Sequence, residues 1–322
     1  MDSVNSHTVM IREIFSLFEE FSEAVKGWDL DFCQLSRADG AFFLEQIAGT
    51  EALISRAHLP SRFLQRGCAM PGYRTVSILT SRNYSASWRW SGETVTHNSL
   101  LVMPVGGEFE SVSAPGLDSI HLTLSIEKLE HVSQTQFEVP LYKLMPDGRC
   151  FCSHGGANLA ILRRLLERAS TGQIDTGGRL LISPQLEDDL AYLVLACLTH
   201  NGAKKPLGPR GHRRKTLDHA LRIIDQSPIE APGAVHLAEL VGVSRRTLEN
   251  AFNDGLGVTP AVYMKARRLC ELGHRLYQSD ARSVRIADLA LACGFHHLGQ
   301  MAADYQCMFG ELPSQTLRRG SR

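Results

Sequence analysis

Two stretches near the C-terminal end share one pattern, and this pattern strongly limits how that part of the chain can fold. In residues 237–248, and again in residues 289–298, an alanine stands four positions before a glycine, and an apolar residue follows the glycine. The small alanine lets two helices cross closely, and the glycine permits a left-handed turn between them. Leu248 and Met301 then stand six and seven positions after the glycines, where they can pack the second helix against the first. The spacing predicts two helix-turn-helix units in tandem.

We expect the two units at about residues 235–256 and 285–309. The segment between them predicts a long rigid connector. Thr259 and Pro260 suit the N-cap and the first position of a helix, which then continues to about Gln278. About 20 residues at ~1.5 Å each give a helix of roughly 30 Å. Successive major-groove faces of DNA lie ~34 Å apart. Such a connector would place both second helices on one side of a duplex, one turn apart.

Charge is divided unevenly along the chain. The total of 34 basic and 34 acidic residues gives a net charge of zero, which taken alone argues against nucleic-acid binding. Residues 206–322 hold 16 of the basic and 11 of the acidic residues, a net charge of +5, so residues 1–205 carry −5. An asymmetry of this kind is typical of a chain with an anion-binding module at one end.

Length and composition predict two domains joined by a linker. A chain of 322 residues exceeds the roughly 100–200 residues of most single domains. Residues 201–211 are rich in glycine, proline and basic residues and have no apolar periodicity, which is typical of a linker. We therefore expect an N-terminal domain over residues 1–203, a linker over residues 204–211 and a C-terminal domain over residues 212–322.

The N-terminal part begins with a helical pattern and continues with short strands. Ile14, Phe18, Phe21 and Val25 follow the spacing of an amphipathic helix. Segments with apolar or alternating character follow: residues 40–48, 52–58, 75–80, 85–90, 99–104, 108–112 and 120–125. Short strands separated by glycine-rich turns are typical of a small sandwich or barrel.

From about Gly155 the apolar period changes to that of helices. Leucines over residues 159–169 mark one helix, and Ser183 followed by Pro184 suits the start of another. We therefore expect an α+β multidomain fold. A small, cupin-like β-barrel with added helices would form the N-terminal domain. The C-terminal domain would be all-α, with two helix-turn-helix units joined by a long helix.

Composition and sequence signals argue against several other classes. Apolar residues make up 43% of the chain, enough to build cores, so disorder is not expected as the main state. No run of 18 apolar residues occurs, so no membrane span is expected. Residues 1–10 lack the pattern of a secretory signal. These features predict a cytoplasmic protein.

The eight cysteines are expected to be reduced thiols, because no export signal accompanies them. We expect Cys270, Cys293 and Cys307 to be buried thiols without a redox role. Residues 150–154 hold two cysteines and a histidine, but a fourth ligand and the usual spacing of a zinc site are absent. The sequence therefore predicts neither a metal nor another cofactor.

The C-terminal residues resemble those of AraC/XylS-type transcriptional regulators over about residues 235–317. Both helix-turn-helix cores match, and so do Phe252, Gly257, Val258, Thr259, Pro260, Gly294, Phe295, Tyr305, Phe309, Gly310, Pro313 and Ser314. Residues 243–252 and 297–306 look like the ethanolamine-utilisation regulator branch. The chain departs from the broader family pattern at Asn250 and Ala303, where arginine is usual, so no operator sequence is carried over.

The resemblance implies which residues of the first unit contact DNA. Ser244 begins the recognition helix as its N-cap, and that end of the helix can also meet a phosphate. Arg245 and Arg246 follow, and an arginine there can bind guanine O6 and N7. By match to the family, Arg246, Glu249 and Asn250 occupy base-facing positions. The alternative for these side chains is contact with phosphate or solvent alone.

The second recognition helix is less polar and is expected to carry less specificity. His296, His297, Gln300 and Ala303 are its groove-facing candidates. Gln300 can read adenine, and an alanine can meet a thymine methyl group. Arg267 is a candidate for contact with the DNA backbone, with a solvated surface position as the alternative. Phe252, Phe295, Tyr305 and Phe309 lie at packing positions and are expected in the core.

The acidic N-terminal domain is expected to sense an effector and to self-associate. The apolar stripe on residues 186–198 fits a helix that pairs in a homodimer, and it fits packing within one chain equally well. Tyr73, Trp88, Trp90 and His97 are candidates for lining a small-molecule pocket, with a core position as the alternative. The resemblance to the ethanolamine branch implies ethanolamine or a related amine as effector.

Together these features predict a bacterial, non-enzymatic, sequence-specific regulator, an activator or repressor. It would bind promoter DNA as a homodimer, with RNA polymerase and a small-molecule effector as further partners. One alternative is an architectural DNA-binding protein without effector. Another is a cupin-type metalloenzyme fused to a DNA-binding domain, but His58, His97 and His121 are scattered, without a His-x-His pair. A DNA-repair protein is disfavoured, because the Pro-Cys-His-Arg motif of alkyl-transfer proteins is absent.

Overall fold

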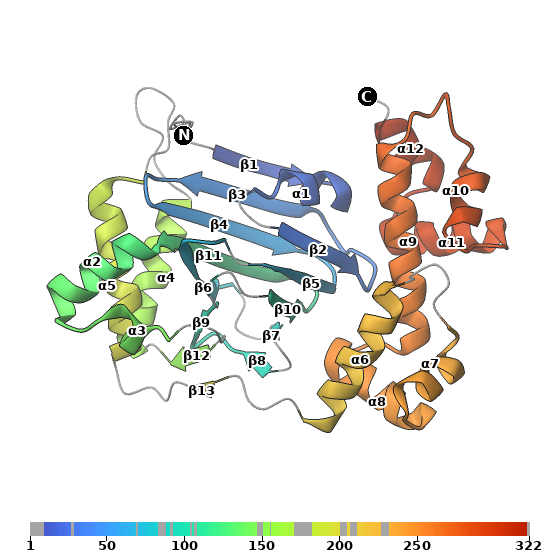
Figure 1. Ribbon diagram of the computed structural model, residues 1–322. Coiled ribbons are helices and arrows are strands. Elements are labelled where there is room, and N and C mark those ends of the chain that lie inside the picture. Colours follow the sequence, from blue (N-terminus) through green and yellow to red (C-terminus); the bar gives the residue numbers. More distant parts are fainter. Residues whose placement is uncertain are drawn as a thin grey trace.

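Two antiparallel sheets form the centre of the N-terminal part in the computed structural model (Figure 1). The structure describes residues 10–26, 29–68, 70–82, 88–90, 93–103, 105, 108–146, 151–154, 156–170, 182–199, 205–206, 211–226 and 232–320. The larger sheet has the order β1 (Met10–Phe15), β3 (Phe42–Ala48), β4 (Ala52–Leu59), β11 (Leu117–Ser125), β6 (Tyr73–Leu79), β9 (Ser99–Val102), β12 (Phe151–His154) and β13 (Lys205–Pro206). The smaller sheet has the order β2 (Asp29–Gln34), β5 (Phe63–Cys68), β10 (Glu108–Val112), β7 (Trp88–Trp90) and β8 (Glu93–Val95).

The two sheets pack face to face through an aromatic core. Phe42 and Leu101 of the larger sheet join Phe63, Trp90 and other residues of the smaller sheet in one buried cluster. Hydrophobic burial of large rings drives this packing. Within the described ranges no strand pairing connects one sheet to the other. The expected sheet domain is confirmed, whereas closure into a cupin-like barrel stays a prediction.

Most of the expected strands form, but the prediction of the first helix was partly wrong. Every predicted strand segment overlaps an observed strand, although residues 83–87 lie outside the described part. Ile14 is in β1 rather than in a helix and is 75% exposed, because β1 pairs with β3 at the edge of the larger sheet. The helix α1 spans only Phe18–Ala24, and it buries Phe18 and Phe21.

Four helices cover the outer face of the larger sheet: α2 (Ile126–Phe137), α3 (Leu141–Leu144), α4 (Gly156–Ser170) and α5 (Pro184–Thr199). The helix α5 begins as predicted, since the Ser183 hydroxyl accepts a hydrogen bond from the Leu186 backbone N–H at 3.2 Å. Its apolar stripe, including Leu190, Val194 and Cys197, is buried in this core. The stripe is therefore used for packing within one chain.

The C-terminal part is helical, as expected. Its helices are α6 (His212–Gln226), α7 (Ala234–Val241), α8 (Arg245–Leu256), α9 (Pro260–Gln278), α10 (Ile286–Ala292), α11 (Leu298–Phe309) and α12 (Pro313–Gly320). The turn glycines Gly242 and Gly294 have φ of 77° and 79°, where only glycine is unstrained. Leu248 is fully buried and Met301 is 3% exposed, so both pack as the pattern predicts.

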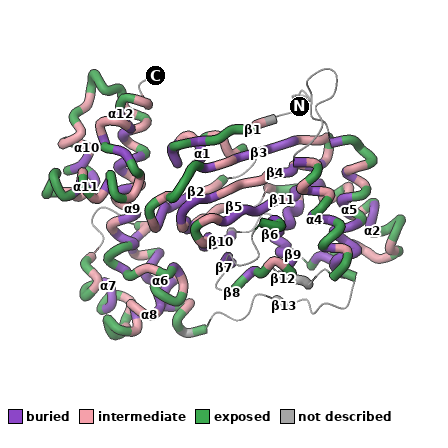
Figure 2. Tube along the Cα trace, turned by 180° about the vertical axis from the view of Figure 1, so that it is seen from behind, coloured by how far each residue is buried: buried purple, intermediate pink, exposed green. Residues whose placement is uncertain are grey.

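The helical part packs against one end of the smaller sheet, away from helices α2–α5 (Figure 1). A single apolar cluster crosses this boundary and joins Leu64 and Val112 of the sheet to Leu221 of α6, Phe252 of α8 and Tyr263 of α9. Figure 2 shows buried residues running along both sheets and into α6, α8 and α9. The two parts therefore share a core.

Most of the expected linker, residues 204–211, lies outside the described ranges, so the domain boundaries stay a prediction. Cys150 and the side chains of residues 151–154, which were weighed as a metal site, also lie outside the described part of the chain. Among the described residues, no group of three or more His, Cys, Asp or Glu is placed to hold a metal ion. No helix in that part of the chain has the length and apolar character needed to cross a membrane.

Candidate nucleic-acid interface

The first recognition helix, α8, begins at a built N-cap. The Ser244 hydroxyl accepts a hydrogen bond from the Thr247 backbone N–H at 3.1 Å, and its backbone is extended. This bond satisfies one of the N–H groups that the first turn of a helix leaves unpaired. The remaining N–H groups of that turn point out of the helix end, where they can meet a phosphate. The predicted capping role of Ser244 is confirmed.

Four polar side chains of α8 are at or near the surface. Arg245 Nε donates to Glu249 Oε1 at 2.8 Å, one helical turn away, and both side chains are exposed. Arg246 is also exposed, and it makes no hydrogen bond or ion pair within the part of the chain that the structure describes. Asn250 is half-buried. Arg246 is therefore the guanidinium that can contact a base without first breaking an ion pair.

The second recognition helix, α11, presents fewer polar groups. His296, His297, Gln300 and Ala303 are all exposed. His297 is the N-cap residue of α11, but its side chain makes no capping bond. Gln300 Nε2 donates to Asp304 Oδ1 at 3.2 Å. All four predicted residues are therefore exposed, His296 and His297 just before α11 and Gln300 and Ala303 within it.

The connector α9 holds the two units in a fixed relation. It has 19 residues, so it is roughly 28 Å long. Its N-cap forms as expected, with the Thr259 hydroxyl accepting from the Val262 N–H at 3.4 Å. Lys265 Nζ binds Asp304 of α11 at 3.1 Å, and the Arg268 guanidinium lies over the Phe295 ring at 5.7 Å. Contacts at several points along α9 therefore orient the second unit.

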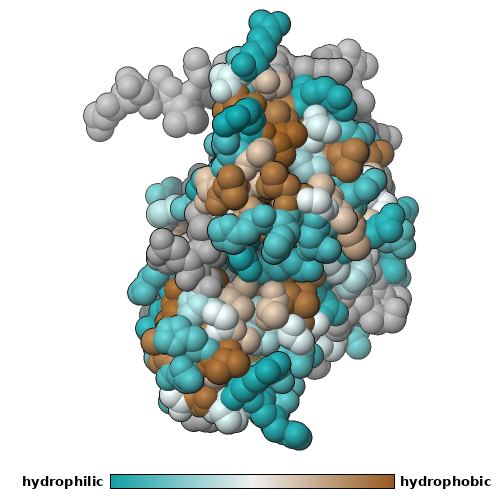
Figure 3. Space-filling model, turned by 90° about the vertical axis from the view of Figure 1, so that its right-hand side faces the viewer, coloured by the Kyte–Doolittle hydropathy of each residue, from teal (hydrophilic) through white to brown (hydrophobic). Residues whose placement is uncertain are grey.

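Hydrophilic residues cover much of the helical part on the side turned away from the sheets, with several separate hydrophobic patches between them (Figure 3). Leu240 of α7, Leu291 of α10 and Leu298 of α11 are each more than a third exposed. Isolated apolar residues of this kind are normal on a protein surface. The exposed polar groups of α8 and α11 are thus accessible without any change in how the domains are packed.

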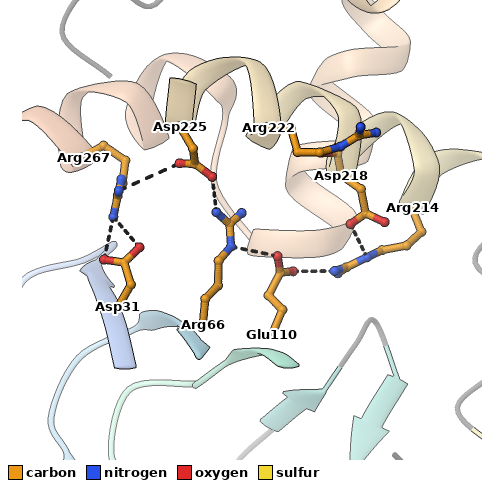
Figure 4. A network of polar contacts seen from close by, with 8 residues as sticks. All are labelled: Asp31, Arg66, Glu110, Arg214, Asp218, Arg222, Asp225 and Arg267. Atoms are coloured by element: carbon orange, nitrogen blue, oxygen red, sulfur yellow. Dashed lines mark hydrogen bonds and ion pairs between the residues drawn. The ribbon is translucent and has the colours of Figure 1, made fainter. Parts of the chain in front are cut away.

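Arg267 was expected to contact the DNA backbone, and this expectation is corrected. Its Nη1 donates to both carboxylate oxygens of Asp31 in β2, at 3.1 and 3.0 Å, and its side chain is 18% exposed. Its Nη2 also lies 3.9 Å from Asp225 of α6. Figure 4 shows the guanidinium between these two carboxylates. In this arrangement Arg267 connects the domains, because its position on α9 faces the smaller sheet.

Arg267 belongs to a chain of ion pairs that crosses the domain boundary (Figure 4). Arg66 of β5 pairs with Asp225 of α6 and with Glu110 of β10, the latter at 3.1 Å. Glu110 also pairs with Arg214 of α6 at 2.6 Å. Burial opposes the charge of Arg66, but Tyr263, Glu110 and Asp225 together raise the pKa of its guanidinium above the ordinary value. The network keeps its arginines charged and aligns α6 on the sheet.

A further arginine of the sheet domain reaches the end of α8. Arg62 Nη1 donates to the carbonyl oxygens of Gly257 at 2.9 Å and Leu256 at 3.3 Å. The last carbonyl groups of a helix lack intrahelical partners and carry negative partial charge, so a guanidinium there is favourable. The N-terminal domain thus contacts the first recognition helix directly at its C-terminal end.

This boundary was not predicted from the sequence, although one signal was present. Arg214, Asp218, Arg222 and Asp225 recur at intervals of three and four residues and so share one face of α6. A helix face that carries alternating charges is usually solvated, so the pattern alone does not identify a partner. Only the placement of Arg66 and Glu110 on neighbouring strands gives the pattern its meaning.

The tryptophans predicted for a ligand pocket are core residues. Trp88 and Trp90 are buried and pack edge to face at 5.4 Å, and Trp90 stacks on Phe109 at 4.7 Å. Trp90 and His121 line a cavity of about 60 Å³ between the sheets. Drug-sized ligands occupy roughly 300–1,000 Å³, so this cavity is too small for one. Burial lowers the pKa of His121 to about 4, so the imidazole is neutral at neutral pH.

The other two predicted pocket residues lie elsewhere. Tyr73 lines a separate surface hollow with Met70 and Glu51. His97 lies before β9, and its carbonyl oxygen accepts a hydrogen bond from Arg163. Burial and the nearby Arg163 charge lower the pKa of His97. In the described part of the chain Tyr73 and Trp90 thus line different cavities, and the predicted common pocket is corrected.

Hollows of ligand size lie instead between the domains. The larger has a volume of about 450 Å³ and is bounded by β2, β5, β10 and α6. Its ionisable lining consists of the carboxylates Asp29, Asp31, Glu110, Asp218 and Asp225 and the guanidinium groups of Arg66, Arg214 and Arg222. Carboxylates thus outnumber guanidinium groups in this cleft.

The three C-terminal cysteines differ in exposure, which corrects one expectation. Cys293 is buried as predicted, whereas Cys270 is half-buried and Cys307 is exposed. Cys307 lies on α11 two positions beyond the buried Tyr305, and this spacing turns it to another side of the helix. The apolar character of cysteine was therefore not enough to predict which of the three thiols are buried.

Comparison with known proteins places the similarity in the C-terminal third. A family model described as a helix-turn-helix domain matches residues 237–319. The XylDLEGF operon transcriptional activator of Pseudomonas putida is 43% identical over 83 residues, 26% of this chain and 26% of that protein. The XylDLEGF operon transcriptional activator 3 of the same organism is 35% identical over 104 residues, 32% of this chain and 31% of that protein.

A solved structure, a probable AraC family transcriptional regulator from Rhodopseudomonas palustris, is 31% identical; the match covers 34% of this chain and 99% of that chain, with a TM-score of 0.31. This chain spans about a third or less of the length of these two XylDLEGF activators. Residues 237–319 form a helix-turn-helix domain of the AraC/XylS type, a DNA-binding domain of transcription regulators. The narrower resemblance to ethanolamine-utilisation regulators stays a prediction.

Proposed function

We propose that this chain is a sequence-specific transcription regulator that binds promoter DNA through two recognition helices in successive major grooves. The observation that carries the proposal is the pair of exposed polar helix faces on α8 and α11, held by a connector of 19 residues. That length, roughly 28 Å, is close to the ~34 Å between successive major-groove faces. The net positive charge of residues 206–322 favours the phosphate backbone as partner.

In this proposal the first unit supplies most of the base recognition. Arg246 binds a guanine through O6 and N7, and Asn250 reads a neighbouring adenine. Arg245 and Glu249 neutralise each other in the free protein, so either one contacts DNA only after their pair opens. An exposed pair of this kind contributes only about 0.3–0.5 kcal/mol, which a base or phosphate contact readily offsets. Ser244 supports the helix end at a phosphate.

The second unit adds a shorter readout. Gln300 is the side chain on α11 that can pair with adenine, and it must leave Asp304 to do so. His296 and His297 lie at the start of the helix, where they reach phosphates, and Ala303 offers only a methyl contact. This unequal division implies that one half of the bound site tolerates more sequence variation than the other.

The remaining parts of the proposal concern partners and place of action. The XylDLEGF relatives are named as activators, so activation through contact with RNA polymerase is the proposed mode. A homodimer is proposed, with Ile161 of α4 and Tyr192 of α5, both nearly half exposed, marking the helical face of the N-terminal domain. The site of action is the cytoplasm, where bacterial promoter DNA lies.

An effector, in this proposal, binds between the two domains rather than between the sheets. The interdomain cleft of about 450 Å³ has the volume that a small organic molecule needs. Because carboxylates are in excess in its lining, a cation such as an amine is the favoured class. Binding there would act on α6 and therefore on the first helix-turn-helix unit.

Replacement of Arg246 by alanine tests the base contact. We expect a loss of ~1–3 kcal/mol in binding to the preferred duplex, together with a relaxed preference at one base position. Arg164→Ala is the matched control, since Arg164 is an exposed arginine of α4 in the N-terminal domain. Binding would be measured by fluorescence anisotropy with a set of duplexes that differ at single positions.

Two outcomes of that experiment would contradict the proposal. An equal loss on every duplex would mean that Arg246 contacts a phosphate rather than a base. Equal binding of wild-type protein to all duplexes would favour the alternative, an architectural DNA-binding protein. Arg164→Ala should bind like wild type at the same salt concentration, because DNA affinity depends steeply on salt.

A further inference from the structure

Two cysteines from different domains meet at the boundary between them. Cys33 is in β2 of the sheet domain and Cys270 is in α9, 237 positions later. Their sulfur atoms lie 4.0 Å apart, and both are free thiols. The carbonyl oxygen of Gln34 lies 3.8 Å from Cys33 Sγ and 3.9 Å from Cys270 Sγ. The two thiols therefore share one small polar environment inside the boundary.

One of these thiols can be reached from solvent and the other cannot. Cys33 is 1% exposed, whereas Cys270 is half-buried and lines an interdomain cleft of about 340 Å³. Arg267 and His274, one turn before and one turn after Cys270 on α9, line the same cleft. A small oxidant that enters the cleft thus reaches Cys270 first.

The surrounding contacts hold the two thiols opposite each other. Two positions before Cys33 on β2, Asp31 accepts both hydrogen bonds from Arg267. One position after Cys33, Gln34 Nε2 donates to the Met308 carbonyl oxygen at 2.9 Å. A disulfide has an S–S distance of about 2.05 Å, so the sulfur atoms need to approach by about 2 Å. Rotation about the two Cα–Cβ bonds is the motion that moves these sulfur atoms relative to each other.

We propose that Cys33 and Cys270 are an oxidation site, which hydrogen peroxide converts to a reversible disulfide between the domains. The Cys270 thiolate attacks one peroxide oxygen, the O–O bond breaks, and hydroxide leaves, so that Cys270 carries a sulfenic acid. The Cys33 sulfur then attacks the Cys270 sulfur, the S–O bond breaks, and hydroxide leaves again. Both hydroxides take the protons that the two thiols release. In sum, two thiols and one peroxide give one disulfide and two waters.

The order of the two steps follows from the environment of each sulfur. Burial, followed by the neighbouring Cys270 thiol, raises the pKa of Cys33 well above its ordinary value, so Cys33 is a poor first nucleophile. It is, however, in contact with Cys270 and can resolve a sulfenic acid there. The resulting bond would connect β2 to α9 covalently. Because α9 joins both helix-turn-helix units, oxidation would fix the position of both units relative to the sheets.

The test uses the full chain, first reduced and then treated with one equivalent of hydrogen peroxide. After the remaining thiols are blocked with N-ethylmaleimide, intact mass and peptide mapping identify the product. We expect a loss of two hydrogen atoms, two fewer blocked thiols, and one peptide pair that joins Cys33 to Cys270. Dithiothreitol should restore both thiols. A bond between other cysteines, or a stable sulfinic acid at Cys270, would overturn the proposal.

Variants give an independent readout. Cys270→Ser and Cys33→Ser should each lose the cross-link, while Cys307→Ser, which changes an exposed cysteine on α11, should keep it. In the wild-type protein, oxidation should also slow hydrogen exchange in α9 and raise the melting temperature. Neither change should occur in Cys270→Ser. If oxidised wild type and oxidised Cys270→Ser showed the same exchange rates, the disulfide would have no effect on the boundary.

Discussion

Shortening Leu64 to alanine is expected to lower the free energy of unfolding by about 2–5 kcal/mol, and both domains should lose stability. Leu64 is in β5 and is 2% exposed. It belongs to the apolar cluster that joins the smaller sheet to Leu221 of α6, Phe252 of α8 and Tyr263 of α9. Removing its side chain leaves a cavity that is lined by residues of both domains, so one domain cannot fill the cavity by rearranging alone. Stability and native-state hydrogen exchange should therefore change together.

Denaturant unfolding gives the total loss, and hydrogen exchange shows where it is felt. We expect faster exchange in α6 and α9 as well as in β5. Ile14→Ala is the matched control, because Ile14 is 75% exposed on the edge strand β1 and surface substitutions usually change stability by less than about 0.5 kcal/mol. Unchanged exchange in α6 and α9 would show that the two domains do not share a core.

The second large effect concerns Glu19, a carboxyl group buried where α1 meets α9. Glu19 is 7% exposed, and a Cβ atom at Gly273 of α9 would lie 2.7 Å from its Oε1. Burial raises the pKa of Glu19 to about 7, and the nearby carboxylates of Glu311, Glu20 and Glu23 add to this, while a backbone hydrogen bond lowers it. The folded protein thus disfavours the ionised form of Glu19 at this boundary.

Glu19→Gln is therefore expected to stabilise the protein in alkaline solution and to have little effect in acid. Because the folded pKa is raised, stability from the protonated carboxyl is fully present below the unfolded pKa and is lost as the pH rises through about 7. A shift of this size corresponds to about 3 kcal/mol at about pH 8.5 and to less than about 1 kcal/mol at about pH 5. Glutamine has nearly the same shape and carries no charge at either pH.

The measurement is the difference in unfolding free energy between Glu19→Gln and wild type at both pH values. The pKa of His121 is lowered in the folded protein, so this histidine makes the protein less stable as the pH falls below its pKa in the unfolded chain. Both proteins contain His121, so taking the difference removes this contribution. Glu127→Gln is the matched control, because Glu127 is an exposed glutamate of α2 and is not one of the carboxylates that act on Glu19; its difference from wild type should stay small at both pH values. A Glu19→Gln variant that is equally stable relative to wild type at both pH values would contradict the buried, protonated carboxyl.

The helix-turn-helix units could be predicted because local rules decide them. Gly242 and Gly294 adopt positive φ angles that other residues avoid, and Ser244 and Thr259 make their capping bonds within three residues. These requirements leave their mark in a short window of sequence. The same reasoning identified Ser183 as the start of α5. Elements with clear caps and turns were thus predicted closely.

The domain boundary could not be predicted, because it depends on residues far apart in the chain. Arg66 and Asp225 are separated by 159 positions, and Arg267 and Asp31 by 236. No local pattern distinguishes Arg267 from an arginine that faces DNA. For the same reason the end of β1 around Ile14 was predicted as helix, since the pairing of β1 with β3 overrides the helical spacing of Ile14 and Phe18.

Some features of the candidate sites could also be predicted from the sequence, and others could not. The exposure of Arg246 on α8 and of Gln300 on α11 agrees with the sequence expectation, whereas their contact with DNA stays a prediction. The expected ligand pocket failed, because Trp88 and Trp90 pack between two sheets whose pairing the sequence does not specify. The described residues leave a cavity of about 60 Å³ beside Trp90, which is small for a ligand site, and both tryptophans are buried.

Selection of bound duplexes from a random library tests whether both recognition helices read DNA. With the full chain, we expect a consensus with two blocks whose centres lie about 10–10.5 base pairs apart, one turn of DNA. The block bound by α8 should be the more sharply defined, and Arg246→Ala should relax that block alone. A single block, or no enrichment over the starting library, would contradict binding through two recognition helices in successive major grooves.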